Sequence, residues 1–201
     1  VFVITIKLSA VPVIIITLFL LNQLLRLKKT KAVLAALFLI MITTTPFIAR
    51  NIISSGYVVF PSVIPDITTV DWKLSNELTV LEKDYITAYA RGIRDGSREE
   101  IQAEAATKNI REWLPLWWRS QSSVDKIILL ITVLSLLGAV IKIKKLFQSD
   151  KDVRIATICA STGILFWFIQ APDPRFGFGF IIALPALILL RLYNFPITLT
   201  Q

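Results

Sequence analysis

Three groups of polar and aromatic residues have the types and spacing to recognise a charged, hydroxyl-rich ligand. They are Arg50-Asn51, Asp71-Trp72-Lys73 and Asp173-Pro174-Arg175. A guanidinium group carries a fork of N–H donors that matches phosphate oxygens. A carboxylate accepts hydrogen bonds from sugar hydroxyls, and an indole ring can stack against a sugar. The functional interpretation of these groups is binding of an anionic ligand such as a pyrophosphate and of sugar hydroxyls.

Each group also has a purely structural interpretation. An arginine at the end of a membrane helix, such as Arg50, commonly extends its charge to the lipid head groups. Asp71 and Lys73 could form an exposed salt bridge, which contributes little to stability. Asp173 and Arg175 could lock a tight, proline-rich turn. The sequence leaves both interpretations open for all three groups.

Aromatic residues add two further candidates. Trp117 and Trp118 come just before an apolar segment, where tryptophans often anchor a protein at the membrane surface. The alternative is a stacking platform for a sugar. Tyr57 lies between the first two polar groups, and with Trp72 we expect it to line the same saccharide.

The composition is that of a membrane protein. Of 201 residues, 55% are hydrophobic, and the mean hydropathy is +0.67, which is too apolar for an ordinary soluble domain. The net charge of +8 is concentrated in two short loops, so we expect no nucleic-acid partner. With one cysteine, Cys159, and no histidine, we expect neither a disulfide nor a metal site. The sequence contains no nucleotide-binding glycine motif and no GxSxG motif, and we expect no cofactor.

The apolar residues form blocks long enough to cross a bilayer, which requires about 20 helical residues. The expected fold is therefore all-α, a polytopic transmembrane helical bundle of about five spans with one extracytoplasmic helical loop region. The expected spans are 8–25, 32–49, 124–143, 153–169 and 178–190, the last one short and split by Pro185. The corresponding regions are 1–49 with two spans, 50–123 as the loop region, and 124–201 with three spans.

Charge sets the expected orientation. The loop after the first span has four basic residues and no acidic ones, and the loop after the third has five basic against two acidic residues. Segment 50–126 has ten basic and eleven acidic residues. Short loops rich in Lys and Arg stay in the cytoplasm. Residues 50–123 and 171–176 are therefore both expected on the extracytoplasmic side.

Two amphipathic helices are expected within 50–123. The first begins after Ser75 and ends at Gly92. The second begins at a capping box formed by Ser97 and Glu100 and continues past Trp113 towards Pro115. We also expect Val1 to be an internal position of a longer polytopic protein, because no signal-peptide cleavage site follows the first apolar run.

Three stretches resemble a family of uncharacterised bacterial polytopic inner-membrane proteins. They read RNIISSGYVVFPS, then VDWK, and FWFIQAPDPRFGFGF near the end. Members usually have a proline where this chain has Val58. That family is similar to GT-C type glycosyltransferases and O-antigen polymerases, and the match corresponds to its C-terminal part. The resemblance implies a multi-pass protein of the bacterial inner membrane that takes part in surface-polysaccharide assembly.

The combined hypothesis is glycosyl transfer or polymerisation with polyprenyl-phosphate-linked saccharides on the periplasmic face. The partners would be the lipid bilayer and that saccharide. Whether the chain is an enzyme stays open, because GT-C enzymes carry their catalytic acid in an earlier loop and no catalytic residue is assigned here. The alternatives are a non-catalytic membrane scaffold subunit and a transporter. The candidate substrate-binding residues are Arg50, Asn51, Tyr57, Asp71, Trp72, Lys73, Trp117, Trp118, Asp173 and Arg175.

Overall fold

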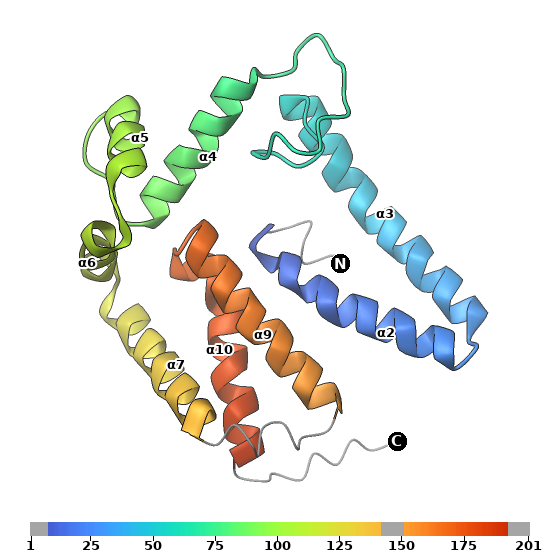
Figure 1. Ribbon diagram of the computed structural model, residues 1–201. Coiled ribbons are helices and arrows are strands. Elements are labelled where there is room, and N and C mark those ends of the chain that lie inside the picture. The colour runs from blue at the N-terminus through green and yellow to red at the C-terminus, as the bar shows by residue number, and fades with distance from the viewer. Residues whose placement is uncertain (1–7, 142–150, 193–201) are drawn as a thin grey trace.

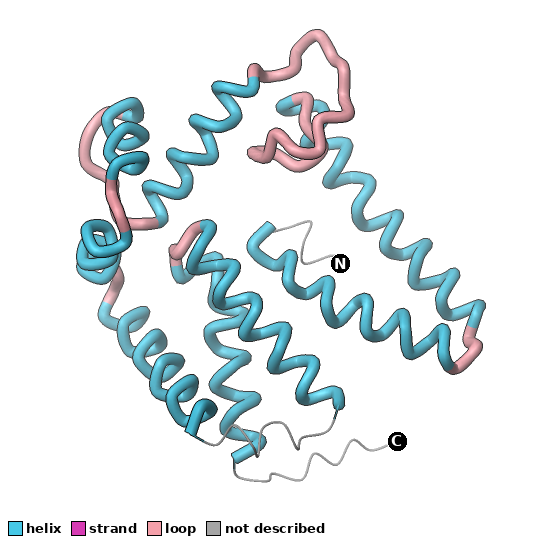
Figure 2. The backbone as a smooth tube through the Cα atoms, viewed as in Figure 1, coloured by secondary structure: helices cyan, strands magenta, loops and turns pink. Residues whose placement is uncertain are grey.

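The computed structural model describes residues 8–141 and 151–192. Within this part of the chain all regular structure is helical, and no strand occurs (Figure 2). The expected all-α fold is thus confirmed.

The N-terminal part consists of two helices joined by a basic turn. A 3₁₀ helix, η1 (Leu8–Val13), contains Pro12 and leads into α2 (Ile14–Arg26). After the turn, α3 extends over Thr30–Ser55. We expected this helix to end at Ala49, but no glycine follows until Gly56, whose φ of 77° supplies the left-handed cap. Arg50 and Asn51 therefore lie inside α3 and not beyond it.

Three short helices follow a long loop. Helix α4 (Asn76–Ala90) is capped by Ser75, whose hydroxyl accepts a hydrogen bond from the Leu78 N–H at 3.2 Å. Helix α5 (Arg98–Thr107) begins with the predicted Ser97–Glu100 capping box. We predicted one helix from there to Trp113, which is wrong. A second capping box, between Asn109 and Glu112, starts a separate helix, α6 (Ile110–Ser120).

Three apolar helices complete the described chain. They are α7 (Ser123–Ile141), α9 (Lys151–Gln170) and α10 (Pro174–Leu192). The last two residues of the third expected span, 142–143, lie outside the described residues. Helix α10 starts four residues earlier than predicted and continues through Pro185 without a break. The reason for the early start is that Asp173 caps the helix and Pro174 occupies its first position, where a missing N–H costs nothing.

Helix α10 packs against both α7 and α9, and α9 also contacts η1 and α2 (Figure 1). The α7–α10 contact includes a hydrogen bond from the Thr132 hydroxyl to the Ile181 carbonyl oxygen at 3.0 Å. Gly163 of α9 makes room for Phe180 of α10, because a Cβ there would lie 2.3 Å from the Phe180 ring. Cys159 is buried, with its sulfur 3.3 Å from the Pro12 carbonyl oxygen.

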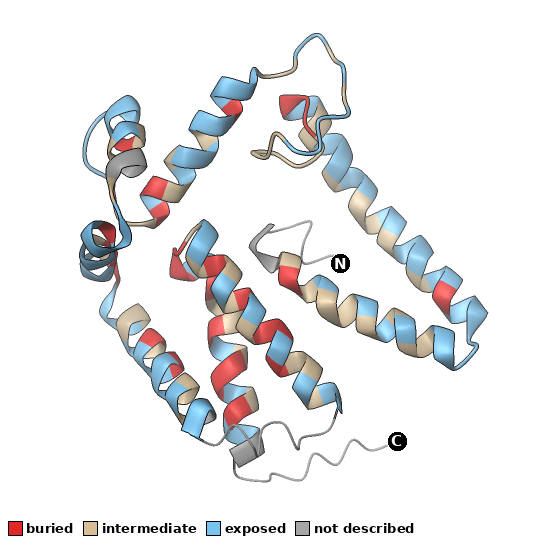
Figure 3. Cartoon of the chain, in the orientation of Figure 1, coloured by how far each residue is buried: buried red, intermediate tan, exposed pale blue. Residues whose placement is uncertain are grey.

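The burial pattern is unusual for a soluble protein. Buried residues concentrate on α9 and α10, whereas α3 is largely exposed along its length (Figure 3). Many of the exposed residues of α3 and α7 are large and apolar. Among the described residues, Thr30–Ser55 and Lys151–Gln170 have the length and hydropathy to cross a membrane. Val11–Arg26 and Pro174–Leu190 are shorter apolar helices.

The helix ends divide into two sets (Figure 1). The basic turn between α2 and α3 lies at one end of the molecule, together with the C-terminal ends of α7 and α10. At the other end lie the loop after α3, helices α4 to α6, and the turn between α9 and α10. The polar candidate residues therefore belong to one end of the described structure.

Candidate functional site

The first feature of the site is a paired acid and base at the start of α10. The carboxylate of Asp173 is buried, with the residue 4% exposed, whereas the Arg175 side chain is 67% exposed. Asp173 accepts hydrogen bonds from the Arg175 backbone N–H at 3.0 Å and from its Nε and Nη2 at 3.0 and 2.6 Å. This two-point contact holds the guanidinium in one orientation at the surface.

The pKa of Asp173 is consistent with a positioning role. Burial by itself would raise the pKa, but the hydrogen bonds and positive charge of Arg175, together with the charge of Arg94, lower it below the ordinary value of an aspartate. The carboxylate is therefore ionised at neutral pH, and both of its oxygens accept hydrogen bonds from the Arg175 guanidinium group. It is poorly suited to accept a proton from a substrate.

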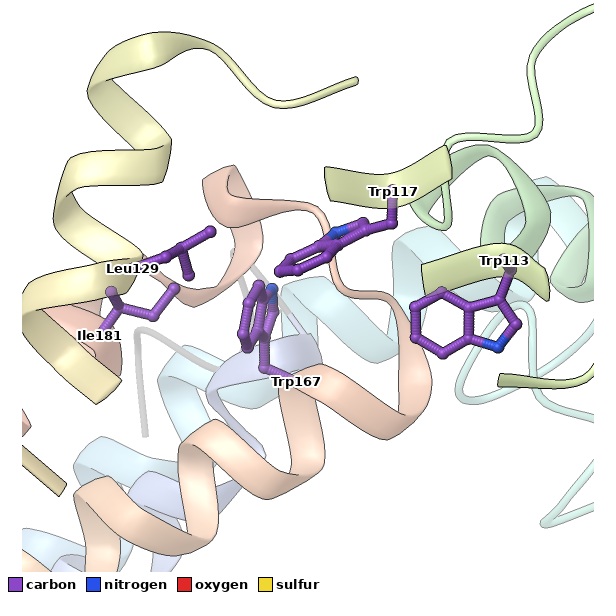
Figure 4. Packing of buried hydrophobic residues seen from close by; sticks show 5 residues of the cluster. All are labelled: Trp113, Trp117, Leu129, Trp167 and Ile181. Carbon is purple, nitrogen blue, oxygen red and sulfur yellow. The ribbon is translucent and has the colours of Figure 1, made fainter. Parts of the chain in front are cut away.

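Two tryptophans hold the turn that carries Asp173. The indole N–H of Trp167 in α9 donates to the Asp173 carbonyl oxygen at 2.7 Å. The indole N–H of Trp117 in α6 donates to the neighbouring Pro172 carbonyl oxygen. Figure 4 shows the two indoles next to each other, Trp117 coming from α6 and Trp167 from α9, and their ring centres are 6.2 Å apart. Gly177 makes room for Trp167, because a Cβ there would lie 2.7 Å from the indole ring.

Sequence inspection missed two residues that complete this site. Arg94 follows the end of α4; its guanidinium carbon is 4.6 Å from the ring centre of Tyr89, and its Nε donates to the Tyr89 carbonyl oxygen at 3.4 Å. The positive charge of Arg94 helps to lower the pKa of Asp173. The pKa of Arg175 is raised by its hydrogen bond to Asp173 and also by the Tyr89 phenol group. These four side chains therefore lie close enough to interact electrostatically. We call Tyr89, Arg94, Asp173 and Arg175 the arginine rim. It combines two guanidinium groups with one buried carboxylate and an aromatic ring.

Arg91, the residue that caps the end of α4, was also missed. Its guanidinium carbon is 5.0 Å from the ring centre of Trp113, and its buried Nε has no hydrogen-bond partner among the described residues. Burial lowers its pKa, and the negative charge of Asp84 opposes this shift. The signal in the sequence was the run RGIRDG after α4. Gly92, with φ of 83°, turns the chain so that Arg91 and Arg94 follow the helix closely.

The candidates from the first half of the chain form a different group, in the loop over the end of α3 (Figure 1). Tyr57 is fully buried; its hydroxyl donates to the Leu74 carbonyl oxygen at 3.0 Å and lies 2.6 Å from the Asn76 side-chain oxygen. Lys73 bonds to Asp66 and to the Thr68 carbonyl oxygen, and its ammonium is 4.8 Å from the centre of the Tyr57 ring. These contacts fold the loop onto itself.

The remaining candidates of this group differ in exposure. Asn51 donates to the Val58 carbonyl oxygen at 3.1 Å and so holds the loop to α3. Trp72 is 57% exposed, although its indole N–H donates to the Ile52 carbonyl oxygen at 3.1 Å. The side chains of Arg50 and Asp71 are exposed and make no hydrogen bond or ion pair within the described part of the chain. Only Arg50, Asp71 and Trp72 of this group are available at the surface.

The two consecutive tryptophans have different surroundings. Trp117 is buried in the cluster of Figure 4, whereas Trp118 is partly exposed, with the Lys126 ammonium 5.9 Å from its ring. The structure thus brings Trp117 together with Asp173 and Arg175. It places Arg50, Asn51, Tyr57, Asp71, Trp72 and Lys73 elsewhere.

The arginine rim has the donors to bind an oxyanion, because guanidinium groups match phosphate oxygens and the aromatic ring adds a stacking surface. No group of three His, Cys, Asp or Glu side chains that could hold a metal ion occurs among the described residues. No curated protein and no solved structure is similar enough to this chain to count as a match. A family model described as "Domain of unknown function (DUF8201)" matches residues 1–182, and the chain therefore belongs to that family.

Proposed function

We propose that this protein is a multi-pass protein of the bacterial inner membrane that binds a polyprenyl-pyrophosphate-linked saccharide on the periplasmic face. Its activity is glycosyl transfer or polymerisation in surface-polysaccharide assembly. Five spans cross the bilayer, formed by η1 with α2, and by α3, α7, α9 and α10. Residues 50–123 and 171–176 lie outside the cytoplasm.

The exposed apolar surface supports the membrane placement. The outward residues of α3 and α7 include Leu34, Phe38, Leu39, Ile127, Leu130 and Leu134, all exposed. A surface of this extent is costly in water but suits contact with lipid chains. The basic residues Arg26, at the end of α2, and Lys28 and Lys29, in the following turn, lie at the end of the molecule opposite to the arginine rim (Figure 1). The rule that Lys and Arg stay in the cytoplasm favours this orientation.

The observation that carries the ligand proposal is the contact between buried Asp173 and exposed Arg175. A buried carboxylate that orients an arginine towards the surface, with Arg94 nearby, suits the recognition of a pyrophosphate. The site lies at the ends of apolar helices, where the head group of a polyprenyl lipid would also lie. In this proposal Arg175 and Arg94 bind the pyrophosphate.

The loop over α3 contributes a second contact surface in this proposal. Arg50, Asp71 and Trp72 are exposed and offer a cation, an acceptor and a stacking ring. Tyr57, Asn51 and Lys73 position the loop through their contacts with its backbone. Trp117 positions the turn that carries Asp173.

The second candidate function is a non-catalytic scaffold subunit of the same machinery. The observation in its favour is that Trp117 and Trp167 are buried and that their indole N–H groups donate hydrogen bonds to backbone carbonyl oxygens. Such contacts stabilise a shape and do not require a ligand. A scaffold would not bind polyprenyl pyrophosphate by itself, and this difference can be measured.

The test is a binding titration of the full chain in lipid nanodiscs with undecaprenyl pyrophosphate as the probe. Binding is measured by the change in intrinsic tryptophan fluorescence. We expect Arg175→Ala to weaken binding about tenfold or more, because a hydrogen bond to a charged group contributes about 1.5–3 kcal/mol. Arg94→Ala should weaken binding too, and it leaves the Asp173–Arg175 pair intact. Arg154→Ala, an exposed arginine in the first turn of α9 at the opposite end, is the matched control and should bind as the unchanged protein does.

Two results would overturn the proposal. One is that the folded protein without substitutions does not bind the probe, and the scaffold subunit would then be the remaining candidate function. The other is equal affinity for the Arg94→Ala, Arg175→Ala and Arg154→Ala variants, which would exclude the arginine rim as the site.

A further inference from the structure

Helix α6 lies across the ends of the apolar helices α7 and α9 (Figure 1). In Figure 1 it is seen end-on, whereas α7 and α9 run along the plane of the picture. One of its faces is buried, because Trp113 and Trp117 pack against Trp167 and Phe168 of α9 (Figure 4). The helix is therefore docked on the apolar helices but does not continue along them.

A second face of α6 is apolar and exposed. Ile110, Leu114 and Trp118 follow each other at intervals of four residues, which places them on the same side of a helix. We call these three residues the outer stripe. Arg111 and Arg119 are also exposed and lie on the polar side of the helix. An apolar stripe beside cationic residues is typical of helices that lie in a membrane interface.

The position of the stripe along the molecule can be fixed from Trp118. Lys126 Nζ lies 5.9 Å from the centre of the Trp118 ring, and Lys126 belongs to the first turn of α7. Beyond this turn the outer surface of α7 is apolar, with Ile127, Leu130 and Leu134 exposed. The outer stripe is therefore level with the point where that apolar surface begins.

We propose that α6 is an interfacial helix, lying in the plane of the membrane with the outer stripe inserted among phospholipids. The occupant is lipid rather than protein because the stripe adjoins the apolar surface of α7. In addition, Arg111, Arg119 and Lys126 supply the positive charge that anionic phospholipid head groups attract. Tryptophan is also enriched at this depth.

This inference rests on the membrane placement in the proposed function and is independent of the saccharide. It has a consequence for the arginine rim. Because Trp117 of α6 is bonded to the turn that carries Asp173, a helix fixed at the interface would hold Arg175 at the depth of lipid phosphate groups. A lipid-linked pyrophosphate is presented at that depth.

The test uses nitroxide labels at single cysteines in the full chain, with Cys159→Ala to remove the native cysteine. The labelled positions are Leu114→Cys and Ile110→Cys in the outer stripe, Arg119→Cys on the polar side of α6, and Leu134→Cys in the middle of α7. Each replaces an exposed side chain. The protein is reconstituted in vesicles of phosphatidylethanolamine and phosphatidylglycerol. Collision with oxygen, which partitions into lipid, and with a water-soluble nickel chelate is measured by electron paramagnetic resonance.

We expect the ratio of oxygen to nickel accessibility at Leu114 and Ile110 to exceed that at Arg119 several-fold. The inference alone is overturned if Leu134 is exposed to oxygen and shielded from nickel while Leu114 and Ile110 behave as Arg119 does. It is also overturned if the stripe labels are shielded from both reagents, because another protein or a second copy would then cover the helix. If Leu134 itself is accessible to nickel, the membrane placement fails, and the proposed function fails with it.

Discussion

The indole N–H of Trp167 donates a hydrogen bond to the backbone carbonyl oxygen of Asp173 over 2.7 Å. The two residues belong to the end of α9 and to the cap of α10, so this bond closes the turn between two apolar helices. The carboxylate of the same aspartate orients Arg175. The position of the exposed guanidinium of Arg175 thus depends on a buried tryptophan six residues before Asp173.

The first prediction concerns this bond. Trp167→Phe should destabilise the protein by about 1–3 kcal/mol, because it removes a buried hydrogen bond and leaves space in the cluster of buried indoles. The Asp173 carbonyl oxygen keeps its second donor, the Phe176 N–H at 2.9 Å. The midpoint of thermal unfolding in detergent measures the effect. Trp72→Phe is the matched control, because it removes the same donor from the Ile52 carbonyl oxygen at an exposed site and should cost less than about 1 kcal/mol. If both variants lose the same amount of stability, the buried Trp167 hydrogen bond contributes no more than the exposed Trp72 hydrogen bond, and the prediction is wrong.

Two glycines of α10 provide the second prediction. A Cβ at Gly177 would lie 2.7 Å from the Trp167 ring, whereas a Cβ at Gly179 would meet nothing within 4 Å. Gly177→Ala should therefore cost about 1–3 kcal/mol through overpacking. Gly179→Ala should be neutral or stabilising by up to about 1 kcal/mol, because alanine favours a helix. Unfolding midpoints of the two variants decide the matter, and a stable Gly177→Ala variant would contradict the tight contact.

The third prediction is the pH dependence of stability. Burial opposes ionisation of Asp173, but the bonds and charge of Arg175 with the charge of Arg94 lower its pKa on balance. A group whose pKa is lower in the folded protein stabilises the fold fully above the unfolded value of about 3.9. This contribution is lost as the pH falls through the lowered pKa.

The variant Asp173→Asn tests this sign. It cannot ionise, so it should be less stable than the unchanged protein at pH 7, and the difference should shrink below about pH 4. The measurement is the unfolding midpoint from about pH 7 down to about pH 2, a range that extends below the ordinary aspartate pKa of about 3.9. A difference that grows towards low pH would mean that Asp173 has a raised pKa.

The fourth prediction concerns the loop over α3. Tyr57→Phe removes the hydroxyl that donates to the Leu74 carbonyl oxygen and lies next to Asn76, and it should cost about 0.5–2 kcal/mol. Tyr85→Phe is the control, because the Tyr85 hydroxyl makes no hydrogen bond within the described residues. Proteolysis of the loop in detergent reports the local effect. Unchanged protection in the Tyr57→Phe variant would exclude a role of this hydroxyl in holding the loop.

Local features of the structure were predictable because they depend on short stretches of chain. Ser75 and Ser97 cap helices as expected, and Gly92 follows the end of α4. Each signal involves hydrogen bonds or backbone angles within a few residues. The same kind of signal at Asn109 and Glu112 was present but overlooked, which is why α5 and α6 were predicted as one helix.

The sequence by itself determined that the fold is all-helical, with apolar segments at defined places, because helix periodicity and capping are local. Only the tertiary structure decided which polar residues meet. Arg94 and Arg175 are 81 positions apart in the sequence. They belong to one rim because α6 packs against the end of α9, and α4 packs in turn against α5 and Leu116 of α6. Likewise, adjacent side chains of a helix point about 100° apart, so Trp117 and Trp118 must differ in surroundings. Trp117 is the buried one because its face of α6 packs against Trp167 of α9. That contact joins residues far apart in the sequence, so the local sequence does not reveal it.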